Sequence, residues 1–515
     1  MRARHLADGA VLAGFPDLDA AAANRAARVL ATALGRDDRV LDAIPAARTV
    51  LVLFDPDRLA HRDLEDLLRH ARSEPSGVAR TVHIPACYGG DAGPDLDELA
   101  RAVALSPGEL ARLHAEAHHE VAFLGFAPGF PYLTGAPAAL AVPRLPSPRI
   151  RVPARSLAVA DGYTGIYPEP SPGGWRLIGR VAVDLFDPGA DPPSLLRPGD
   201  RVVFDPIEVA ELARFESRAR PAPSPPRNPA LRVLDPGLYT TVQSGPRHGL
   251  GAFGVGAGGA MDLPSLAAAN EAVGNPAFAG ALEMTLAGPR LELVADASFA
   301  LAGAALEARS NGTILEGRGP WRGAAGDHLE LGPIRDGVRA YLALAGGLAP
   351  APRGSAARPL HAQEVVGRAD DPAPEPFAPP HARRLAVERV PALRAMEGPQ
   401  WNLFTDTGRA TFFSAEYRVT AASDRRGMRL DGPRIEVARP SDIPPEGTAP
   451  GAVQVPGAGL PIVLGPDRPV TGGYAKIATV ISADLPILAQ ARPGTMIRFV
   501  PATLEEALAA RRQAR

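Results

Sequence analysis

Two arginines separated by one residue, Arg149 and Arg151, are the first side chains whose type and spacing suggest chemistry. Alternate residues of a β-strand face the same side of a sheet, so a strand here would point both guanidinium groups in one direction. Such a pair can hold a carboxylate or a phosphate group through parallel hydrogen bonds. The other interpretation is two solvated arginines on an exposed strand, and the sequence leaves both open.

Two glycine-rich segments that carry hydroxyl and indole groups are further candidates for binding a ligand. Thr164-Gly-Ile-Tyr167 and Ser171-Pro-Gly-Gly-Trp175 place hydrogen-bond donors beside backbone that glycine leaves uncovered. The stretch 123–132 is rich in Phe, Gly and Pro, although aromatic residues make up only 5% of the chain. We interpret it either as the filling of a barrel core or as one wall of a ligand slot.

The only lysine of the chain, Lys476, follows Gly472-Gly-Tyr-Ala475 and opens an apolar stretch, which predicts that it is partly buried. A buried lysine needs a partner, and its pKa can shift toward the range that is useful for proton transfer, as that of arginine cannot. Genome composition is the alternative reason for one lysine among 55 Lys and Arg residues.

Acids, an amide and an arginine form further candidate groups. Asp262 precedes a segment that begins with proline and is helical in pattern, and it is predicted to be the N-cap of that helix. Asn270 lies on the apolar stripe of the same helix, so its amide must bond either to backbone or to a ligand. Asp424 and Arg425 flank a glycine turn and predict a salt-bridged hairpin or part of a site.

Several widespread motifs are missing. Gly249-Leu-Gly-Ala-Phe-Gly254 fits the spacing G-x-G-x-x-G, but glycines continue through Gly259 and the predicted helix begins only near Pro264. We therefore do not interpret it as a dinucleotide fingerprint. The sequence contains no P-loop, H-E-x-x-H or G-x-S-x-G motif. The single Cys87 excludes a disulfide framework and cysteine-cluster metal sites, and we predict no bound metal.

The composition of the 515 residues indicates three to four globular domains, with 46% apolar and 22% charged residues. The 53 glycines and 56 prolines indicate many turns between short strands. A net charge of −2 argues against nucleic-acid binding. Neither a signal peptide nor an apolar run of about 18 residues is found, so we expect a cytoplasmic protein without membrane contact.

The elements that must position these residues are mainly β, with an α+β domain at the N-terminus. Strands near 10–15, 40–44, 49–54 and 78–84, with two helices between them, predict the β-α-β-β-α-β order of a ferredoxin-like domain. Beyond residue 120, short strands between Gly/Pro turns predict a barrel or sandwich.

An internal repeat is the clearest organisational pattern. Arg197–Pro206 and Arg492–Pro501 share a Pro-Gly turn, an alternating strand and a following helix at a constant offset. Upstream, Thr164–Tyr167 is matched with Thr471–Tyr474. The ordered set predicts two related β units.

Proline clusters suggest the domain boundaries. Residues 221–229 predict an extended linker, and residues 370–380 predict a surface excursion. The predicted segments are 1–80 (ferredoxin-like), 81–220 (barrel), 221–230 (linker), 231–345 (first part of a second β region), 346–400 (irregular excursion) and 401–515 (second part with a terminal helix).

These motifs resemble a known pair of families. Residues 123–133, 164–168 and 171–179 resemble the B subunit of bacterial 5-oxoprolinase, the KipI or allophanate hydrolase subunit 1 family. Seven further segments resemble the C subunit, or KipA family: 240–243, 259–262, 273–275, 281–283, 423–425, 451–456 and 471–479. The resemblance implies a fusion of B and C with a ferredoxin-like domain and duplicated cyclophilin-like barrels.

The resemblance also implies an activity, a cofactor and a partner. The chain would open the lactam of 5-oxoproline to glutamate, using ATP, together with a separate A subunit and as a possible homo-oligomer. The expected catalytic positions are Lys476, Asp262, Glu283 and Arg425. The expected positions for binding a small amide-type substrate are Arg149, Arg151, Thr164, Tyr167, Ser171, Trp175, Gln243, Arg247, Asn270, Asp424, Gln454 and Tyr474.

Two other functions stay open at this stage. The family is similar to the carboxyltransferase part of urea carboxylase, which implies a carboxyltransferase component acting on a urea- or guanidine-like substrate. No biotinyl-lysine context occurs in the sequence, so a biotin carrier would be another protein. The KipI family name implies a regulator of a sensor histidine kinase.

Overall fold

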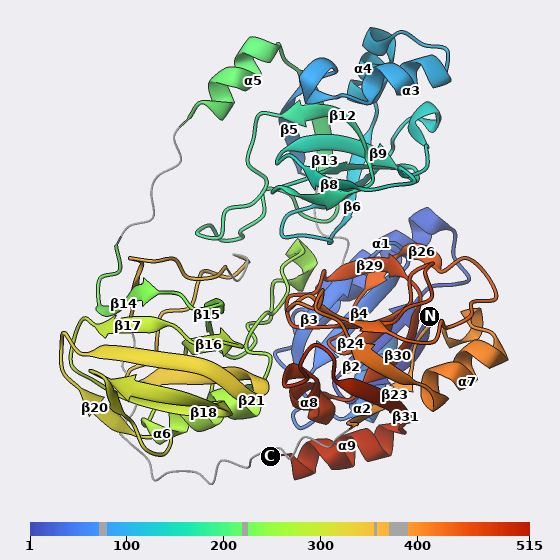
Figure 1. The fold of residues 1–515 in the computed structure, drawn as a ribbon. Helices are drawn as coiled ribbons and strands as arrows, with labels where there is room; N and C mark the ends of the chain where they lie inside the picture. Colours follow the sequence, from blue (N-terminus) through green and yellow to red (C-terminus); the bar gives the residue numbers. More distant parts are fainter. Residues whose placement is uncertain (72–79, 219–224, 355–357, 370–389, 515) are drawn as a thin grey trace.

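The computed structural model describes residues 1–71, 80–218, 225–354, 358–369 and 390–514. Four parts are visible in Figure 1: an N-terminal α+β domain, a first barrel, an open sheet and a second barrel. The N-terminal domain packs against the second barrel, although the two lie at opposite ends of the chain. Among the described residues, no helix is long and apolar enough to span a membrane.

The N-terminal domain is an antiparallel sheet in the order β1-β2-β4-β3. Its elements are β1 (Arg2–Ala7), β2 (Ala10–Gly14), α1 (Ala20–Leu34), β3 (Val40–Pro45), β4 (Thr49–Phe54) and α2 (His61–His70). Side chains alternate between two faces. Val11 and Val52 pack under the helices, whereas Leu12 and Leu51 pack against the second barrel.

The predicted strand order of this domain is wrong at both ends. Residues 2–7 form a first strand that the sequence analysis missed. Of the predicted last strand near residues 78–84, positions 78 and 79 lie outside the described residues, and Thr81–Tyr88 (β5) belongs to the first barrel. The alternating pattern showed that 81–84 is a strand, but pattern alone does not show which sheet a strand joins.

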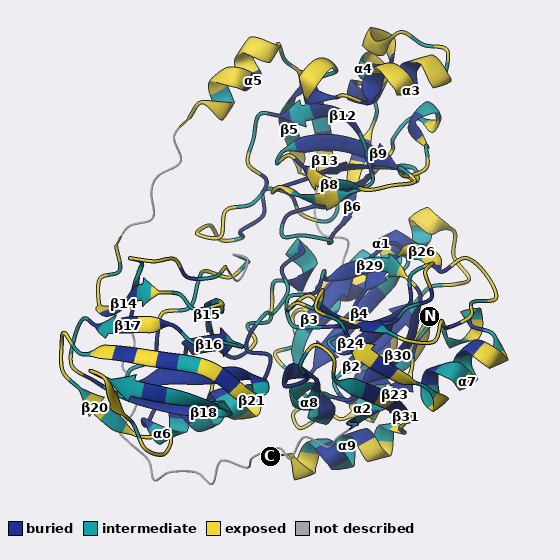
Figure 2. Ribbon diagram, viewed as in Figure 1, coloured by how far each residue is buried: buried dark blue, intermediate teal, exposed yellow. Residues whose placement is uncertain are grey.

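The first barrel closes in the order β10-β7-β6-β13-β5-β12-β9, and a ribbon of β8 and β11 lies beside it. Its further strands are β6 (His119–Leu124), β7 (Pro131–Thr134), β8 (Arg149–Val152), β9 (Ser156–Ala160), β10 (Tyr163–Ile166), β11 (Ser171–Gly173), β12 (Arg176–Val181) and β13 (Arg201–Pro206). Its helices are α3 (Leu96–Ala102), α4 (Pro107–Ala115) and α5 (Val209–Glu216). Figure 2 shows the barrel strands largely buried and α5 largely exposed.

The second barrel closes in the order β23-β30-β27-β28-β25-β24-β31, with a ribbon of β26 and β29. Its strands are β23 (Ala392–Glu397), β24 (Glu416–Val419), β25 (Gly427–Asp431), β26 (Asp442–Gly447), β27 (Ala452–Gln454), β28 (Ile462–Leu464), β29 (Thr471–Tyr474), β30 (Lys476–Val480) and β31 (Met496–Pro501). Its helices are α7 (Asp406–Ser414), α8 (Leu485–Ala489) and α9 (Leu504–Gln513).

The two barrels have the same topology, which confirms the predicted repeat. β13 and β31 each pair in parallel with the first strand of their barrel and antiparallel with the second. The remaining strands follow in the same cyclic order, and each barrel carries one side ribbon. The upstream match was misaligned, however: Thr471–Tyr474 (β29) corresponds to Ser171–Gly173 (β11), whereas Thr164 lies on β10.

An open nine-stranded sheet lies between the barrels in the sequence. Its strands are β14 (Pro229–Asp235), β15 (Tyr239–Gln243), β16 (Ala281–Thr285), β17 (Arg290–Leu293), β18 (Ala297–Ser310), β19 (Thr313–Ile314), β20 (Trp321–Gly323), β21 (His328–Leu344) and β22 (Val365–Gly367). One helix, α6 (Leu263–Ala272), packs on β18 and β21. Residues 370–380 and residues 221–224 of the predicted linker lie outside the described residues. The predicted irregular segment 346–400 contains β22 of the open sheet and β23 of the second barrel, so it is not irregular throughout and the second barrel begins before residue 401.

The two barrels meet closely at Gly125, just after β6. A Cβ atom at this position would overlap the side chain of Thr471 on β29. The next residue, Phe126, donates its backbone N–H to Thr471 Oγ1 at 3.1 Å. Glycine at 125 therefore lets the first and second barrels touch.

We expect the Gly125→Ala variant to be less stable by about 1–3 kcal/mol, because overpacking of a close contact costs this much. Thermal or denaturant unfolding measures the loss, and a second change, Thr471→Ala, should restore part of it. Gly108→Ala is the matched control, since a Cβ atom there meets nothing within 4 Å. Equal stability of Gly125→Ala and wild type would contradict the close contact.

Candidate functional site

A cavity of about 530 Å³ lies where the first barrel, the open sheet and the second barrel meet. The first barrel contributes residues 126–128 and 169–172. The open-sheet domain contributes residues of strand β15, loop residues between 247 and 259, and residues 351–354. The second barrel contributes 424–426 and 466–469. Because ligand sites are found preferentially at domain junctions, this cavity is the candidate functional site.

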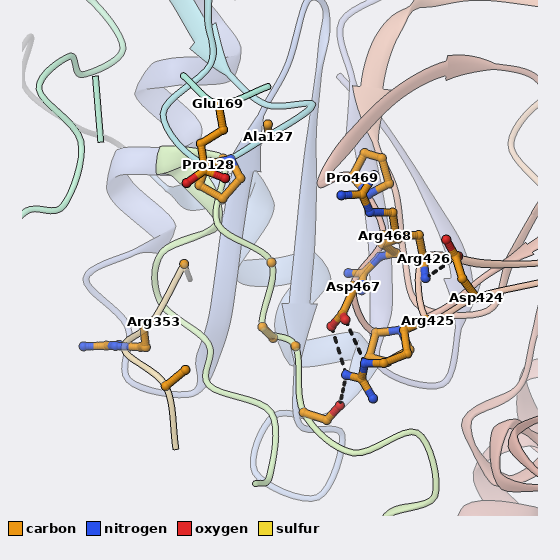
Figure 3. A pocket seen from close by; sticks show the side chains of 18 of the residues that line it. Ala127, Pro128, Glu169, Arg353, Asp424, Arg425, Arg426, Asp467, Arg468 and Pro469 are labelled. Atoms are coloured by element: carbon orange, nitrogen blue, oxygen red, sulfur yellow. Dashed lines mark hydrogen bonds and ion pairs between the residues drawn. The ribbon is translucent and has the colours of Figure 1, made fainter. Parts of the chain in front are cut away.

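Five of the predicted substrate-binding or catalytic residues line this cavity. They come from all three parts of the chain: Ser171, Gln243, Arg247, Asp424 and Arg425. Figure 3 shows Arg425 beside Arg426, Asp467 and Arg468, with Arg353 set apart from this group. The structure thus brings together residues that are up to 254 positions apart in the sequence, between Ser171 and Arg425.

Arg425 is held on several sides. Its guanidinium donates to Glu283 Oε1 at 2.5 Å, to Asp467 Oδ2 at 2.7 Å and to the carbonyl oxygen of Gly259 at 2.6 Å. Burial opposes its charge, but Glu283 and Asp467 outweigh burial and raise the pKa of Arg425 above its ordinary value. Arg425 therefore fixes the loops that carry Gly259 and Asp467 at the cavity wall.

Glu283 is a buried carboxylate behind this wall and does not line the cavity. It also accepts hydrogen bonds from Tyr341 Oη at 2.7 Å and from the backbone N–H of Met261 at 2.8 Å. Burial alone would raise its pKa, but Arg425 and Arg339 overcome burial and hold the pKa of Glu283 below its ordinary value. Glu283 is thus ionised and supports Arg425.

Asp262 is also buried and does not line the cavity. It is the N-cap of α6 and accepts from Ser265 N at 3.0 Å, which confirms its predicted capping role. Gln490 Nε2 donates to its other oxygen at 2.6 Å. Burial raises the pKa of Asp262, against the lowering effect of Gln490 and Ser265. Its hydrogen bonds join the open sheet to the second barrel.

Arg247 and Arg353 differ from Arg425 in their partners. Arg247 donates to the carbonyl oxygen of Ala351 at 2.7 Å, and Arg353 donates to that of His248 at 3.3 Å. Among the described residues, neither forms an ion pair with a carboxylate. Burial, together with the positive charge of Arg353, lowers the pKa of Arg247. This wall of the cavity therefore carries uncompensated positive charge.

The predicted residues of the first barrel lie away from the cavity, apart from Ser171. Arg149 pairs with Asp95 at 2.6 Å, while Arg151 is exposed, so the two do not converge on one group. Thr164 Oγ1 lies 3.0 Å from His114 Nε2. Tyr167 and Trp175 belong to a buried aromatic cluster that also contains Phe123, Phe130 and Tyr132. The stretch 123–132 therefore fills the barrel core, while its residues 126–128 form one wall of the cavity.

The other predicted residues also lie outside the cavity lining. The amide of Asn270 donates to backbone carbonyls, at 2.9 Å to Ala279, so its predicted burial is confirmed with backbone partners. Gln454 is buried, and Tyr474 is 40% exposed. Lys476 is fully buried and its Nζ lies 2.5 Å from Glu446 Oε1.

Sequence reasoning missed several lining residues, among them Glu169, Arg353, Arg426, Asp467 and Arg468. Asp467 and Arg468 stand between two prolines in a strand connection, and such a charged turn is one signal that could have found them. The glycine segment 249–254 is a short turn with no strand-to-helix context, which confirms that it is no dinucleotide fingerprint. The glycines that follow it nevertheless line the cavity.

The N-terminal domain holds the loop that leads to these glycines. Asp42 on β3 accepts from His248 Nδ1 at 3.1 Å and from the backbone N–H groups of Gly249 and Gly251 at 3.1 and 2.8 Å. Gly254 approaches the first barrel so closely that a Cβ atom would lie 2.6 Å from the carbonyl oxygen of Ala127. All four parts of the chain therefore position the cavity.

Comparison with known proteins agrees with this architecture. Residues 1–196 match the family described as "Carboxyltransferase domain, subdomain C and D", and residues 253–501 match "Carboxyltransferase domain, subdomain A and B". The solved protein TTHA0988 is 38% identical, with a TM-score of 0.82, and the alignment covers 97% of this chain and all of that one. The fold and its central cavity thus define a protein of the carboxyltransferase-domain class.

Two curated relatives divide the chain between them. The B subunit of the 5-oxoprolinase from Bacillus subtilis is 41% identical over 185 residues, which are 33% of this chain and 76% of the relative. The C subunit of the 5-oxoprolinase from Escherichia coli is 38% identical over 296 residues, 55% of this chain and 94% of the relative. The chain belongs to the family of the B and C subunits of 5-oxoprolinase, here fused in one polypeptide.

A more distant likeness extends to larger enzymes. The urea amidolyase of Lachancea kluyveri is 32% identical over 314 residues, which are 54% of this chain but only 17% of that protein. The chain is therefore homologous both to components of a 5-oxoprolinase complex and to one region of urea amidolyase.

Proposed function

We propose that the chain is the B/C component of an ATP-dependent 5-oxoprolinase that opens the lactam of 5-oxoproline to glutamate together with a separate A subunit. The observation that carries this proposal is the composition of the cavity. Its walls come from the segment similar to the B subunit, at 126–172, and from segments similar to the C subunit, at 239–259 and 424–469. A site built by both halves explains why they function as a unit.

The chemistry of a lactam fits an arginine-lined cavity. Amide resonance makes the lactam carbonyl a poor electrophile, so we propose that ATP phosphorylates its oxygen and ADP leaves. One water then attacks the carbon and the C–N bond opens; a second water releases phosphate, which leaves glutamate. Negative charge grows on oxygen in these steps, and preorganised donors at that position stabilise it.

Among the predicted catalytic residues, we propose that only Arg425 contacts the reacting molecule. Asp262 and Glu283 lie behind the lining and would act as positioning residues, because Glu283 holds Arg425 and Asp262 holds Gln490. Gln243 and Ser171 line the cavity from opposite halves and offer neutral donors for a small amide. Lys476 is proposed to support the second barrel.

Mixing the purified chain with a candidate A subunit, 5-oxoproline and ATP tests the proposal. We expect glutamate and ADP to form only in the complete mixture. Omitting the chain, the A subunit or ATP provides the three controls. Absence of glutamate from the complete mixture, with all proteins folded, would contradict the proposed activity.

The carboxyltransferase descriptions of both matched families favour a second candidate, transfer of a carboxyl group to a urea- or guanidine-like molecule. The chain could not carry biotin itself, since its only lysine is buried. Bicarbonate-dependent ATP consumption in the presence of a biotin carboxylase partner, without glutamate formation, would favour this candidate over the first.

A further inference from the structure

Four consecutive residues of the cavity wall, Gly256 to Gly259, have free backbone donors. Their neighbours are bonded: Val255 N donates to Leu250 O at 3.3 Å and Ala260 N to Ser244 O at 2.9 Å. Within the described part of the chain, no backbone carbonyl accepts a hydrogen bond from the N–H groups of 256–259. Buried or half-buried backbone donors almost always have partners, so such a run calls for an acceptor from outside the chain.

The backbone of this run has the form in which neighbouring N–H groups can converge. Gly258 and Gly259 have φ values of +59° and +94°, in the left-handed region that glycine adopts without strain. Where successive backbone N–H groups converge, they form a concavity that binds anions, and glycines leave such donors uncovered by side chains. The place of a missing Cβ at Gly256 and Gly258 meets only ordinary contacts, at 3.6 Å or more. The neighbour of Gly258 at 3.8 Å is Oδ1 of Asp467, whose charge Arg425 compensates.

Arg247 contacts the same run, and Arg353 lies close enough to Arg247 to affect its charge. Arg247 N donates to the carbonyl oxygen of Ala257 at 2.9 Å, which places Arg247 against the middle of the run. The side chains of Arg247 and Arg353 then bond reciprocally to the segments at Ala351 and His248. These contacts bring two guanidinium groups to one wall, where they have no carboxylate partner among the described residues.

The acidic residues of the cavity are engaged or exposed. Asp467 is paired with Arg425 at 2.7 Å, and Asp424 accepts from the backbone N–H groups of Arg426 and Gly427 at 2.8 and 3.0 Å. Glu169 lies at the exposed rim on the first barrel. No carboxylate of the described lining therefore neutralises the wall of Arg247 and Arg353.

We infer that Gly256–Gly259, Arg247 and Arg353 form an oxyanion subsite that binds a carboxylate or phosphoryl group of the reacting molecules. The inference rests on the proposed function, because it takes this cavity as the substrate site. It adds that the site binds an anionic molecule. Planar guanidinium forks and backbone N–H groups match the oxygens of both anions. A neutral urea-like molecule would leave both arginines without a counter-charge.

Anion binding to the full-length chain, without any A subunit, tests the subsite. Isothermal titration calorimetry at low ionic strength would use inorganic phosphate, acetate and 5-oxoproline as probes. We expect Arg247→Gln and Arg353→Gln each to weaken anion binding about tenfold or more, since hydrogen bonds to charged groups contribute this much. Arg25→Gln, a change at an exposed arginine of α1 outside the cavity, is the matched control and should bind as wild type does.

Both arginine variants must be folded for their anion affinities to be compared with that of wild type. Arg353 is exposed and makes a single long hydrogen bond at 3.3 Å, so its replacement should leave the fold intact even if Arg247→Gln unfolds. Far-ultraviolet circular dichroism checks both variants. Wild type that binds none of the three anions, or a folded Arg353→Gln variant with unchanged affinity, would overturn the inference.

Competition identifies the anion. If 5-oxoproline displaces phosphate, the two anions share the subsite; if they bind together, the anion whose affinity Arg353→Gln lowers is the one that occupies it. Failure of the subsite and failure of the proposed function are distinguishable. Arginine-dependent anion binding without glutamate formation leaves the subsite standing, whereas glutamate formation that is unaffected by Arg353→Gln removes the subsite alone.

Discussion

Replacing Glu283 by glutamine is expected to lower the free energy of unfolding by about 3–5 kcal/mol, because buried Arg339 loses its counter-charge and buried Arg425 keeps only Asp467. Glu283 is 1% exposed, and Arg425 beside it is 5% exposed. Arg339 lies 3.8 Å away and is also buried. A neutral amide could still accept a hydrogen bond from Arg425, but it could not neutralise two guanidinium groups.

The effect should depend on pH in a defined direction. The pKa of Glu283 is depressed in the folded chain relative to its ordinary value of 4.5. Its stabilising contribution is therefore fully present above about pH 4.5 and is lost as the pH falls through the folded pKa. We expect the stability difference between wild type and Glu283→Gln to be largest near neutral pH and to narrow on acidification.

Urea unfolding at several pH values measures both effects, and Glu330→Gln on the same sheet is the control. Glu330 is exposed on β21, so its change should stay within about 0.5 kcal/mol. The Glu283→Gln variant should also reduce turnover with the A subunit, because Arg425 would lose one of the partners that fix it at the cavity wall. A Glu283→Gln protein as stable as wild type at pH 7 would show that Arg425 does not depend on this ion pair.

The sequence predicted those features that depend on local pattern. The strand from Arg201 and the strand from Met496 keep the same alternation and the same preceding Pro-Gly turn, and they occupy equivalent places in the two barrels. Asp262 was recognised as a cap because capping needs only a side chain and the next turn of helix. Such features are encoded within a few residues.

Partners that are distant in the sequence could not be predicted in this way. Arg149 is neutralised by Asp95, and Arg425 by Glu283, 142 positions away. No spacing rule connects these residues, because the fold alone brings them together. The predicted arginine pair on β8 therefore has one member in an ion pair, whereas the uncompensated arginines lie on loops of the open-sheet domain.

The cavity likewise depends on contacts between residues that are distant in the sequence. Its lining comes from three parts of the chain and mostly from connections between strands, where periodicity carries no signal. The resemblance to 5-oxoprolinase subunits directed attention to Gln243, Arg247 and Arg425, and these line it. Arg353 and Arg468 stand outside the family motifs; the charged turn between two prolines is a sequence signal for Arg468, whereas only the three-dimensional arrangement reveals Arg353.

The predicted burial of Lys476 is correct, but burial is compatible with either a catalytic or a structural role. Its burial was predicted from the surrounding apolar strand, and it is 0% exposed. Yet its ammonium group contacts Glu446 on β26, at 2.5 Å, and it lies outside the cavity lining. Gln400 completes the cluster, since its amide donates to Glu446 at 2.7 Å and accepts from the backbone N–H of Lys476 at 3.1 Å.

We expect Lys476→Met to lower the free energy of unfolding by about 3–5 kcal/mol, because Glu446 would keep the hydrogen bond from Gln400 but remain as a buried charge without a counter-charge. Glu446→Gln should cost a similar amount by leaving the ammonium group alone. The double variant Lys476→Met/Glu446→Leu removes both charges and should recover most of the loss, as apolar replacements of buried ion pairs often do.

A double-mutant cycle on the free energy of unfolding separates this structural role from a chemical one. Strong coupling between the two positions, with turnover recovered in the stable double variant, would assign Lys476 to the packing of the second barrel. A Lys476→Met protein that unfolds like wild type but no longer supports glutamate formation would instead return the residue to the catalytic machinery. The buried position and the single carboxylate partner favour the first result, because an ammonium group that contacts the substrate must reach the cavity.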